Sequence, residues 1–162
     1  MYANGRRRVR RLRPEVLDML GLHGAVEEML RHYDSGSGCR FAFHSEGEFS
    51  KLGNGLAISA YRIVQEALSN IMKHSGATAA EVTLVLDAEQ GQLRIEVEDN
   101  GHGFDPTHSS EGIGIIGMRE RVYALHGTIA VRSAPQRGTT VAIALPLSPP
   151  SALPRAGPTA VS

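Results

Sequence analysis

The stretch Val97–Asp105, which reads VEDNGHGFD, decides how the rest of the chain is interpreted. An alternating strand pattern ends there at an acidic residue, Asp99, and two glycines follow one residue apart, Gly101 and Gly103. A simple hairpin turn needs only the Asn-Gly pair. Glycines also let a backbone approach a flat ligand closely, and a carboxylate accepts a hydrogen bond from an exocyclic amine such as that of adenine. For this motif alone a tight turn or a calcium loop is an alternative, but the additional spaced acids and the bidentate glutamate of a calcium loop do not follow.

The composition is that of one ordinary domain. The chain has 162 residues, and its 17 basic residues balance 17 acidic ones, which argues against a globally basic nucleic-acid binder. Cys39 is the single cysteine, so an internal disulfide and a multi-cysteine zinc site are excluded. No apolar run approaches the roughly 18 residues of a membrane span, and no signal peptide is visible. We expect a cytoplasmic domain, with any membrane anchor in a longer parent chain.

The two ends of the chain differ in composition from its middle. Residues 1–13 include six arginines and predict a basic arm, which is either a solvated helix end or an arm for nucleic acid. The lack of interleaved aromatic side chains argues against the second interpretation. Residues 149–162 are rich in Pro, Ser and Ala without periodicity, which is typical of a disordered tail. The sequence therefore predicts one folded domain over residues 14–148.

The hydrophobic period changes several times within that domain. Pro14 suits a first helical turn, and the pattern after it indicates a helix to about Arg31, broken near Gly21 or Gly24. The other expected elements are a loop at 35–38, a strand at 40–44, a helix at 54–75 ended by Gly76, a hairpin of strands 81–86 and 92–98, a helix at about 115–125 stopped by Gly127, and a hairpin of strands 128–133 and 139–145. Hairpins with helices packed on one face predict an α+β fold, a two-layer α/β sandwich.

The longest predicted helix carries a polar stripe. Arg62, Glu66, Asn70 and His74 follow one another at intervals of four residues, so they lie on one side of the helix. An ordinary solvated surface is one explanation. If the stripe faces a site, the oxygen atoms of Glu66 and Asn70 suit a hard cation such as Mg²⁺, and the Glu66 carboxylate is placed to orient or deprotonate a nucleophile.

A glycine-rich loop leads into the next predicted helix. Residues 111–122 read EGIGIIGMRERV, and the free N–H groups at a helix start bind anions such as phosphate. The segment is not a Walker loop, because no G-K-[ST] follows, and it lacks the parallel βαβ context of a dinucleotide-binding fingerprint. The alternative to an anion site is a flexible loop that starts a helix. Farther on, residues 137–140 (RGTT) open the final strand. They either form a plain hairpin turn or supply a hydroxyl group that supports the Asp99 carboxylate.

In this order and spacing, the motifs resemble those of the GHKL ATPase superfamily, which includes gyrase, mismatch-repair ATPases and sensor histidine kinases. YRIVQEALSNIMKHSGA looks like the N box of that family, EDNGHGF like its first glycine box, EGIGIIGMRERV like its second, and GTTVAIALPL like its closing strand. Three segments narrow the resemblance further: M-R-E-R after the glycines, K-H in the N box, and the linker-like LRPEVLDMLGLHGAVEEML. They resemble the histidine-kinase subfamily that pairs with helix-turn-helix response regulators of the nitrate and sugar-phosphate sensing type. The resemblance implies a Bergerat-type ATP-binding fold with a mixed, mostly antiparallel sheet.

The resemblance also implies a role for each motif residue. Asp99, helped by Thr139, would hold the adenine amino group in a pocket lined by Gly101 and Gly103. Asn70 would ligate Mg²⁺ between the phosphates of ATP, and Glu66 would act on the incoming nucleophile. The other implied nucleotide-binding residues are Lys73, His74, Gly112, Gly114, Gly117 and Met118.

The resemblance finally implies what surrounds this domain. Kinases of this family move the γ-phosphoryl of Mg·ATP to a histidine on a dimerisation helix, and then to a response regulator. The seven histidines, at positions 23, 32, 44, 74, 102, 108 and 126, do not occur in such a context, so we expect the catalytic part of a longer, homodimeric kinase with the arginine-rich start as the end of a dimerisation helix. The alternatives are a serine kinase of the anti-sigma-factor type and a non-catalytic nucleotide-binding interaction module; direct binding of nucleic acid is not expected.

Overall fold

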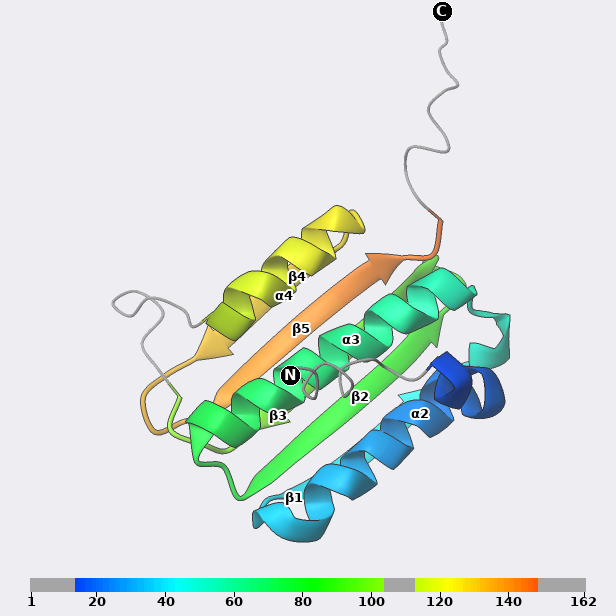
Figure 1. Ribbon diagram of the computed structural model, residues 1–162. Helices are drawn as coiled ribbons and strands as arrows, with labels where there is room; N and C mark the ends of the chain where they lie inside the picture. The colour runs from blue at the N-terminus through cyan, green and yellow to red at the C-terminus, as the bar shows by residue number, and fades with distance from the viewer. Residues whose placement is uncertain (1–13, 104–112, 149–162) are drawn as a thin grey trace, which may run out of the picture.

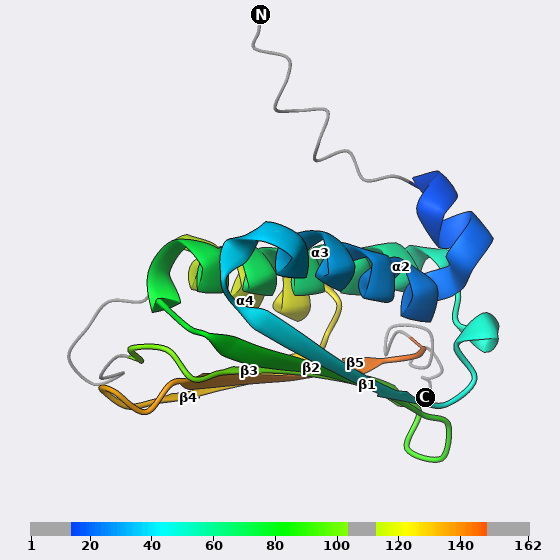
Figure 2. The ribbon, with the colours of Figure 1, turned by 90° about the horizontal axis from the view of Figure 1, so that it is seen from below.

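The structure is a computed structural model that describes residues 14–103 and 113–148 (Figure 1). Within these residues the helices are α2 (Pro14–Ser37), α3 (Asn54–Asn70) and α4 (Ile113–Ala124), with a 3-10 turn η1 (Phe49–Lys51) and a π-helical turn η2 (Ile71–Ser75). The strands are β1 (Arg40–Glu46), β2 (Ala79–Asp87), β3 (Gln92–Asp99), β4 (Thr128–Ser133) and β5 (Thr139–Pro146). The three helices lie together on one face of the sheet (Figure 2), which confirms the expected two-layer α+β sandwich.

The five strands form one sheet in the order β1-β2-β3-β5-β4. Both predicted hairpins are present, because β2 pairs antiparallel with β3 and β4 pairs antiparallel with β5. Strand β1 runs parallel to β2, and parallel neighbours need a long crossover connection. Helix α3 supplies that connection and crosses the helical face of the sheet (Figure 1). The mixed, mostly antiparallel sheet is therefore confirmed.

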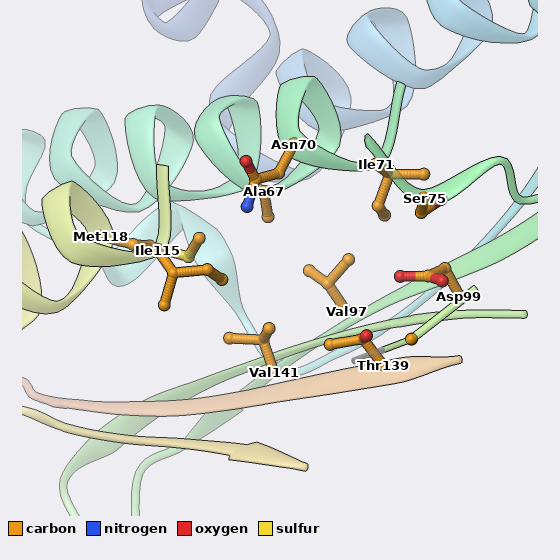
Figure 3. A pocket seen from close by; sticks show the side chains of 11 residues that line it. Ala67, Asn70, Ile71, Ser75, Val97, Asp99, Ile115, Met118, Thr139 and Val141 are labelled. Carbon is orange, nitrogen blue, oxygen red and sulfur yellow. The ribbon is translucent and has the colours of Figure 1, made fainter. Parts of the chain in front are cut away.

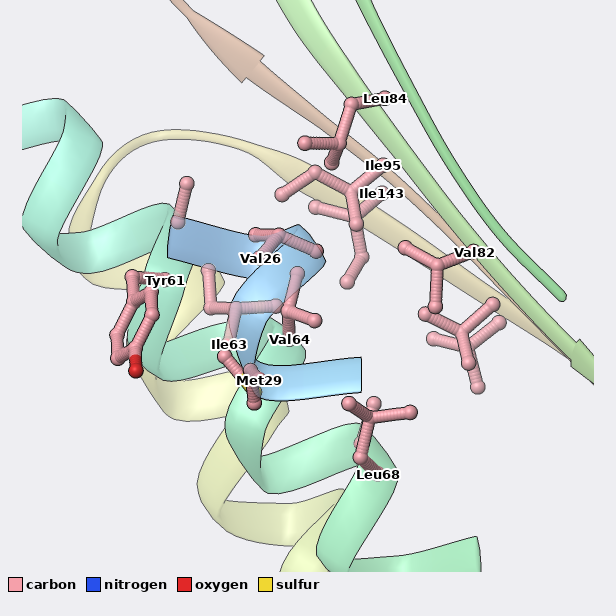
Figure 4. Close-up of a cluster of buried hydrophobic side chains, with 14 of the residues drawn as sticks. Val26, Met29, Tyr61, Ile63, Val64, Leu68, Val82, Leu84, Ile95 and Ile143 are labelled. Carbon is pink, nitrogen blue, oxygen red and sulfur yellow. The ribbon is translucent and has the colours of Figure 1, made fainter. Parts of the chain in front are cut away.

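The core lies between the sheet and the helices. Buried side chains repeat every second residue along β3 and β5, as expected for strands with one covered face. The two strands pair so that Val97 stands opposite Val141 and Ile95 opposite Ile143. Figure 4 shows Ile95 and Ile143 of the sheet facing the apolar side of α3. The largest fully buried side chains are Leu22, Val26, Ile63, Val64, Leu68, Val82, Leu84, Leu93, Ile95, Met118, Val122 and Leu145.

Helix α2 differs from its prediction at its end but not at its break. Gly21 has φ 71° and ψ 176°, which interrupts the helix where the sequence indicated a break at Gly21 or Gly24. The helix then continues to Ser37, six residues beyond Arg31, so the predicted loop at 35–38 was wrong. The helix stops only before Gly38, whose φ of 81° is the left-handed conformation that glycine adopts at low cost.

The long predicted helix at 54–75 is divided into two parts. Helix α3 ends at Asn70, and η2 continues it to Ser75 as a single π-helical turn. Gly76 follows with φ 65° and ends the helix as predicted, because a left-handed residue closes helices at this position. Wide π turns of this kind recur at functional sites, and η2 borders the cavity described below.

Helix α4 begins at Ile113, two residues before its predicted start, and ends at Ala124. None of the helices in the described part of the chain has both the length and the apolar character needed to cross a bilayer. The predicted basic arm at 1–13 and the predicted tail at 149–162 lie outside the described residues.

Candidate functional site

A cavity of about 140 Å³ opens between the helical layer and one end of the sheet (Figure 3). Its walls come from α3, η2, the end of β3, the start of α4 and the start of β5. The lining residues are Ala67, Asn70, Ile71, Ser75, Val97, Asp99, Gly103, Ile115, Met118, Thr139 and Val141. Drug-sized ligands usually occupy about 300–1,000 Å³, so this space suits a flat base better than a whole nucleotide.

Asp99 is the charged residue among those that line this cavity. The period of two that buries Leu93, Ile95 and Val97 also turns Asp99 toward the helices, where it is only 8% exposed. The Gly101 N–H donates a hydrogen bond of 2.8 Å to Asp99 Oδ1, which leaves Oδ2 available to a ligand. Burial raises the pKa of Asp99 above its usual 3.8, and the Gly101 hydrogen bond opposes this in part. The result is a fixed acceptor that faces an otherwise largely apolar space.

Thr139 lies beside Asp99 because the two residues are register partners between β3 and β5. Its hydroxyl is 2.8 Å from the Ser133 hydroxyl, and the Ser133 hydroxyl also donates to the Gly138 carbonyl at 3.1 Å. This chain of contacts holds Thr139 Oγ1 at the cavity wall, which agrees with the proposal of a hydroxyl next to the carboxylate.

Gly101 and Gly103 are required by close backbone approaches. A Cβ at Gly101 would collide with the Ser75 carbonyl oxygen, and a Cβ at Gly103 would collide with the Ala134 carbonyl oxygen. Gly103 also has φ 67°, a conformation that costs other residues energy. The two glycines thus pack the loop after β3 against η2 and against the β4–β5 turn. Gly103 lines the cavity and Gly101 donates to Asp99 Oδ1; the structure explains both glycines by backbone packing, and the close approach of a flat ligand stays a prediction.

The opposite wall carries the end of the polar stripe. Asn70 lines the cavity together with Ser75 from η2, and Lys73 lies exposed on η2 between them. His74 belongs to the same turn. The Asn70 amide is an oxygen donor of the kind that Mg²⁺ accepts, and no group of three His, Cys, Asp or Glu side chains forms a metal cluster anywhere in the described residues. Asn70 is therefore the cavity residue that fits the predicted Mg²⁺ ligand by its chemistry.

Glu66 takes a different position from its neighbour on the stripe. It does not line the cavity; its side chain is 28% exposed and turns toward α4. Its Oε1 lies 3.6 Å from Arg121 Nε, and a Cβ at Gly117 would lie 2.9 Å from its Oε2. The four-residue spacing therefore predicted one side of the helix correctly but not the neighbour that Glu66 contacts.

The second glycine-rich segment is described only in part. Gly112 lies outside the described residues, while Gly114 and Gly117 belong to α4. Met118, one turn after Gly114, is fully buried and lines the cavity. Of the residues suggested for nucleotide binding, Asp99, Asn70, Gly103, Met118 and Thr139 are brought together around the cavity.

The apolar part of the cavity wall was not predicted. Ala67, Ile71, Val97, Ile115 and Val141 line it without having been singled out. The signal was available in the strands, because Val97 and Val141 precede Asp99 and follow Thr139 by two residues and so share their face. These side chains form the apolar part of the cavity wall, as is usual for small-molecule sites.

The chain resembles known proteins in sequence and in structure. Residues 55–149 match the family described as histidine kinase-, DNA gyrase B-, and HSP90-like ATPase. The signal transduction histidine-protein kinase/phosphatase DegS of Brevibacillus brevis is 34% identical over 147 residues, which are 90% of this chain and 38% of DegS. The histidine-protein kinase/phosphatase UhpB of Salmonella typhimurium is 36% identical over 90% of this chain and 29% of UhpB. The chain thus spans well under half of the length of these relatives.

A solved structure shares the fold. The histidine kinase domain from the blue-light activated histidine kinase of Erythrobacter litoralis superposes with a TM-score of 0.61 and covers 82% of this chain and 69% of that one. At 21% sequence identity this likeness concerns the architecture of sheet and helices alone.

Proposed function

Because the chain belongs to the histidine kinase-, DNA gyrase B- and HSP90-like ATPase family, we propose that it is the ATP-binding catalytic domain of a two-component sensor histidine kinase. The observation that carries this proposal is the buried carboxylate of Asp99, which faces a small, largely apolar cavity and keeps one oxygen free for a donor. An adenine ring offers both a flat apolar face and an exocyclic amine that donates to such an oxygen.

The proposed roles follow the two walls of the cavity. Asp99 and Thr139 hold the edge of the adenine ring, while Val97, Met118 and Val141 cover its faces. We place the phosphates beside Asn70, where they would leave the cavity, with exposed Lys73 three residues farther along the chain. Mg²⁺, held by Asn70 and the phosphates, would neutralise charge during the reaction. The protein then acts mainly by positioning and by electrostatics, as phosphoryl transfer requires.

Glu66 is proposed as the residue that acts on the nucleophile. It stands one helical turn before Asn70 and outside the small cavity, with its carboxylate against α4, and we place the γ-phosphoryl group and the incoming imidazole beside that carboxylate. We place the acceptor histidine on a dimerisation domain outside these 162 residues, with a response regulator as the next acceptor and a homodimer as the parent protein. We also place the domain in the cytoplasm, where ATP and response regulators are found.

Two measurements test the proposal. Isothermal titration calorimetry with ADP or ATP and Mg²⁺ should give a saturable binding signal; a folded sample without any heat of binding would refute the nucleotide site. Incubation with γ-labelled ATP should label a supplied acceptor-histidine domain but not the chain itself. The label should be acid-labile, as a phosphohistidine is; an acid-stable label on a serine substrate would favour the serine-kinase alternative.

A further inference from the structure

Helix α4 offers the Glu66 carboxylate two residues that lie one turn apart. Arg121 contributes a cation 3.6 Å from Glu66 Oε1. Gly117 contributes bare backbone beneath Oε2, because any Cβ there would lie 2.9 Å from that oxygen, closer than Cβ contacts normally come. Both carboxylate oxygens are therefore met by α4. We call Gly117 and Arg121 the carboxylate seat.

One atom of Glu66 and one atom of Arg121 have no hydrogen bond where the carboxylate meets the seat. Glu66 Oε1 and Arg121 Nε are both closed off from solvent, and neither finds a hydrogen-bond partner in the part of the chain that the structure describes. Their separation of 3.6 Å allows ionic attraction but is too long for a hydrogen bond. Desolvation offsets much of the attraction in such a pair, so the seat contributes little to stability. Its effect on the direction of the carboxylate is the more important consequence.

We propose that Gly117 and Arg121 are positioning residues for Glu66. This inference rests on the proposed role of Glu66 in phosphoryl transfer. Arg121 draws Oε1 into the interface between α3 and α4, and Gly117 lets the carboxylate lie close against α4. Neither residue is among the described residues that line the cavity, so both act on transfer through Glu66. A reactive group displaced by about 1 Å can lose about 100-fold in rate, which is why such a seat matters.

The seat also connects the two elements that border the cavity. Helix α4 supplies Ile115 and Met118 to the cavity wall, and α3 supplies Ala67 and Asn70. Glu66 belongs to the same helix as Ala67 and Asn70, and its carboxylate contacts the seat on α4. A movement of α4 that follows nucleotide binding would therefore move the carboxylate as well, since Gly117 and Arg121 lie on the same helix as the lining residues.

The test compares transfer rates with nucleotide affinity. Arg121→Met removes the charge and keeps the length, Arg121→Lys keeps the charge, and Gly117→Ala adds the Cβ that would displace Oε2. We expect Arg121→Met to slow single-turnover transfer to a supplied acceptor domain at least tenfold, with the Kd for Mg·ADP changed less than twofold. Arg121→Lys should recover part of the rate, although it lacks the fork of the guanidinium group. Arg132→Met is the matched control, because Arg132 forms an exposed ion pair with Glu96 at 3.9 Å, between β4 and β3, and does not contact Glu66 in that pair.

A double-mutant cycle shows whether the effect passes through Glu66. In a Glu66→Gln background, Arg121→Met should cause no further loss of rate. A wild-type rate in Arg121→Met, or an equal fold-loss in the Glu66→Gln background, would overturn the proposal. If Gly117→Ala weakens nucleotide affinity and leaves the transfer rate unchanged, Gly117 binds nucleotide and is not part of the seat.

Failure of the proposed function would give a different result. If the wild-type chain transfers no phosphoryl group, the kinase assignment fails, and the seat is judged by unfolding alone. The shifts in urea midpoint for Glu66→Gln and Arg121→Met should then be non-additive in the double variant, because the two side chains contact each other. Additive shifts would overturn the seat itself.

Discussion

Replacing Asp99 by asparagine should weaken nucleotide binding and at the same time strengthen the fold. The side chain keeps its shape, and an amide oxygen still accepts the Gly101 hydrogen bond. The second oxygen, however, becomes an NH₂ group that meets the adenine amine donor to donor. A hydrogen bond to a charged acceptor contributes about 1.5–3 kcal/mol, and every 1.4 kcal/mol is about tenfold in affinity. We expect the Kd for ADP to rise by about 10- to 150-fold.

The expected gain in stability follows from the pKa of the same carboxyl group. Burial raises the pKa of Asp99 in the folded chain above the usual 3.8, so the folded state binds its proton more tightly than the unfolded state. The resulting stabilisation is present at pH below 3.8 and is lost as pH rises through the raised folded-state pKa. At pH 7 the ionised group therefore costs stability, and the neutral asparagine removes that cost.

Calorimetry and urea unfolding measure the two effects on one sample. Asp99→Asn should show the weaker Kd together with a higher urea midpoint at pH 7, and the midpoint advantage should shrink as the pH is lowered toward 4. Asp87→Asn is the control, since Asp87 forms a surface pair with Arg94 at 3.0 Å and should leave the Kd unchanged. A Kd within threefold of wild type would refute the adenine role; a lower midpoint at pH 7 would refute the reasoning from burial.

Three further predictions concern the cavity and its surroundings. Asn70→Ala should remove the effect of Mg²⁺ on ATP affinity while ADP without Mg²⁺ binds as before, and an unchanged Mg²⁺ effect in calorimetry would contradict the ligand role. Gly101→Ala should lower the free energy of unfolding by about 1–3 kcal/mol, as overpacking does, because its Cβ would meet the Ser75 carbonyl. Gly55 of α3 has open space around it, so the control Gly55→Ala should instead raise the free energy of unfolding by up to about 1 kcal/mol. Cys39 is buried, and its thiol pKa is raised, first by burial and then by the charges of Asp99 and Asp34. It should therefore react with Ellman's reagent far more slowly in the native chain than in urea. Equal rates would show that the core around Cys39 opens readily.

Most of the fold could be predicted because each strand and helix carries its own period. The two hairpins, the helix end at Gly76 and the break at Gly21 all follow from local patterns. Two features could not be obtained in this way. The parallel pairing of β1 with β2 depends on which strand lies next to which. The continuation of α2 to Ser37 runs against the weak helix preference of serine and glycine, so no local pattern indicates it.

A site residue was predictable where the helix or strand that contains it also determines which way its side chain points. Asp99 belongs to the buried side of β3, so alternation alone directs its carboxylate inward. Glu66 is the opposite case, because its direction depends on a contact with Arg121 in a helix that follows 55 residues later in the sequence. The sequence contained both residues, but no local period connects α3 with α4. The π turn η2 was also hidden, since an apolar repeat looks the same over an α-helical and a π-helical turn.

The pairing of β3 with β5 has a consequence for how the chain avoids misfolding. If one strand slipped past the other by two residues, every apolar side chain would still point inward, so the hydrophobic effect hardly discriminates against that error. The slip would nevertheless separate Asp99 from Thr139 and destroy any base recognition. Gly138 permits the native alignment, because a Cβ at this position would collide with the Asp99 carbonyl oxygen. A side chain at position 138 would therefore oppose the one alignment that places Asp99 beside Thr139.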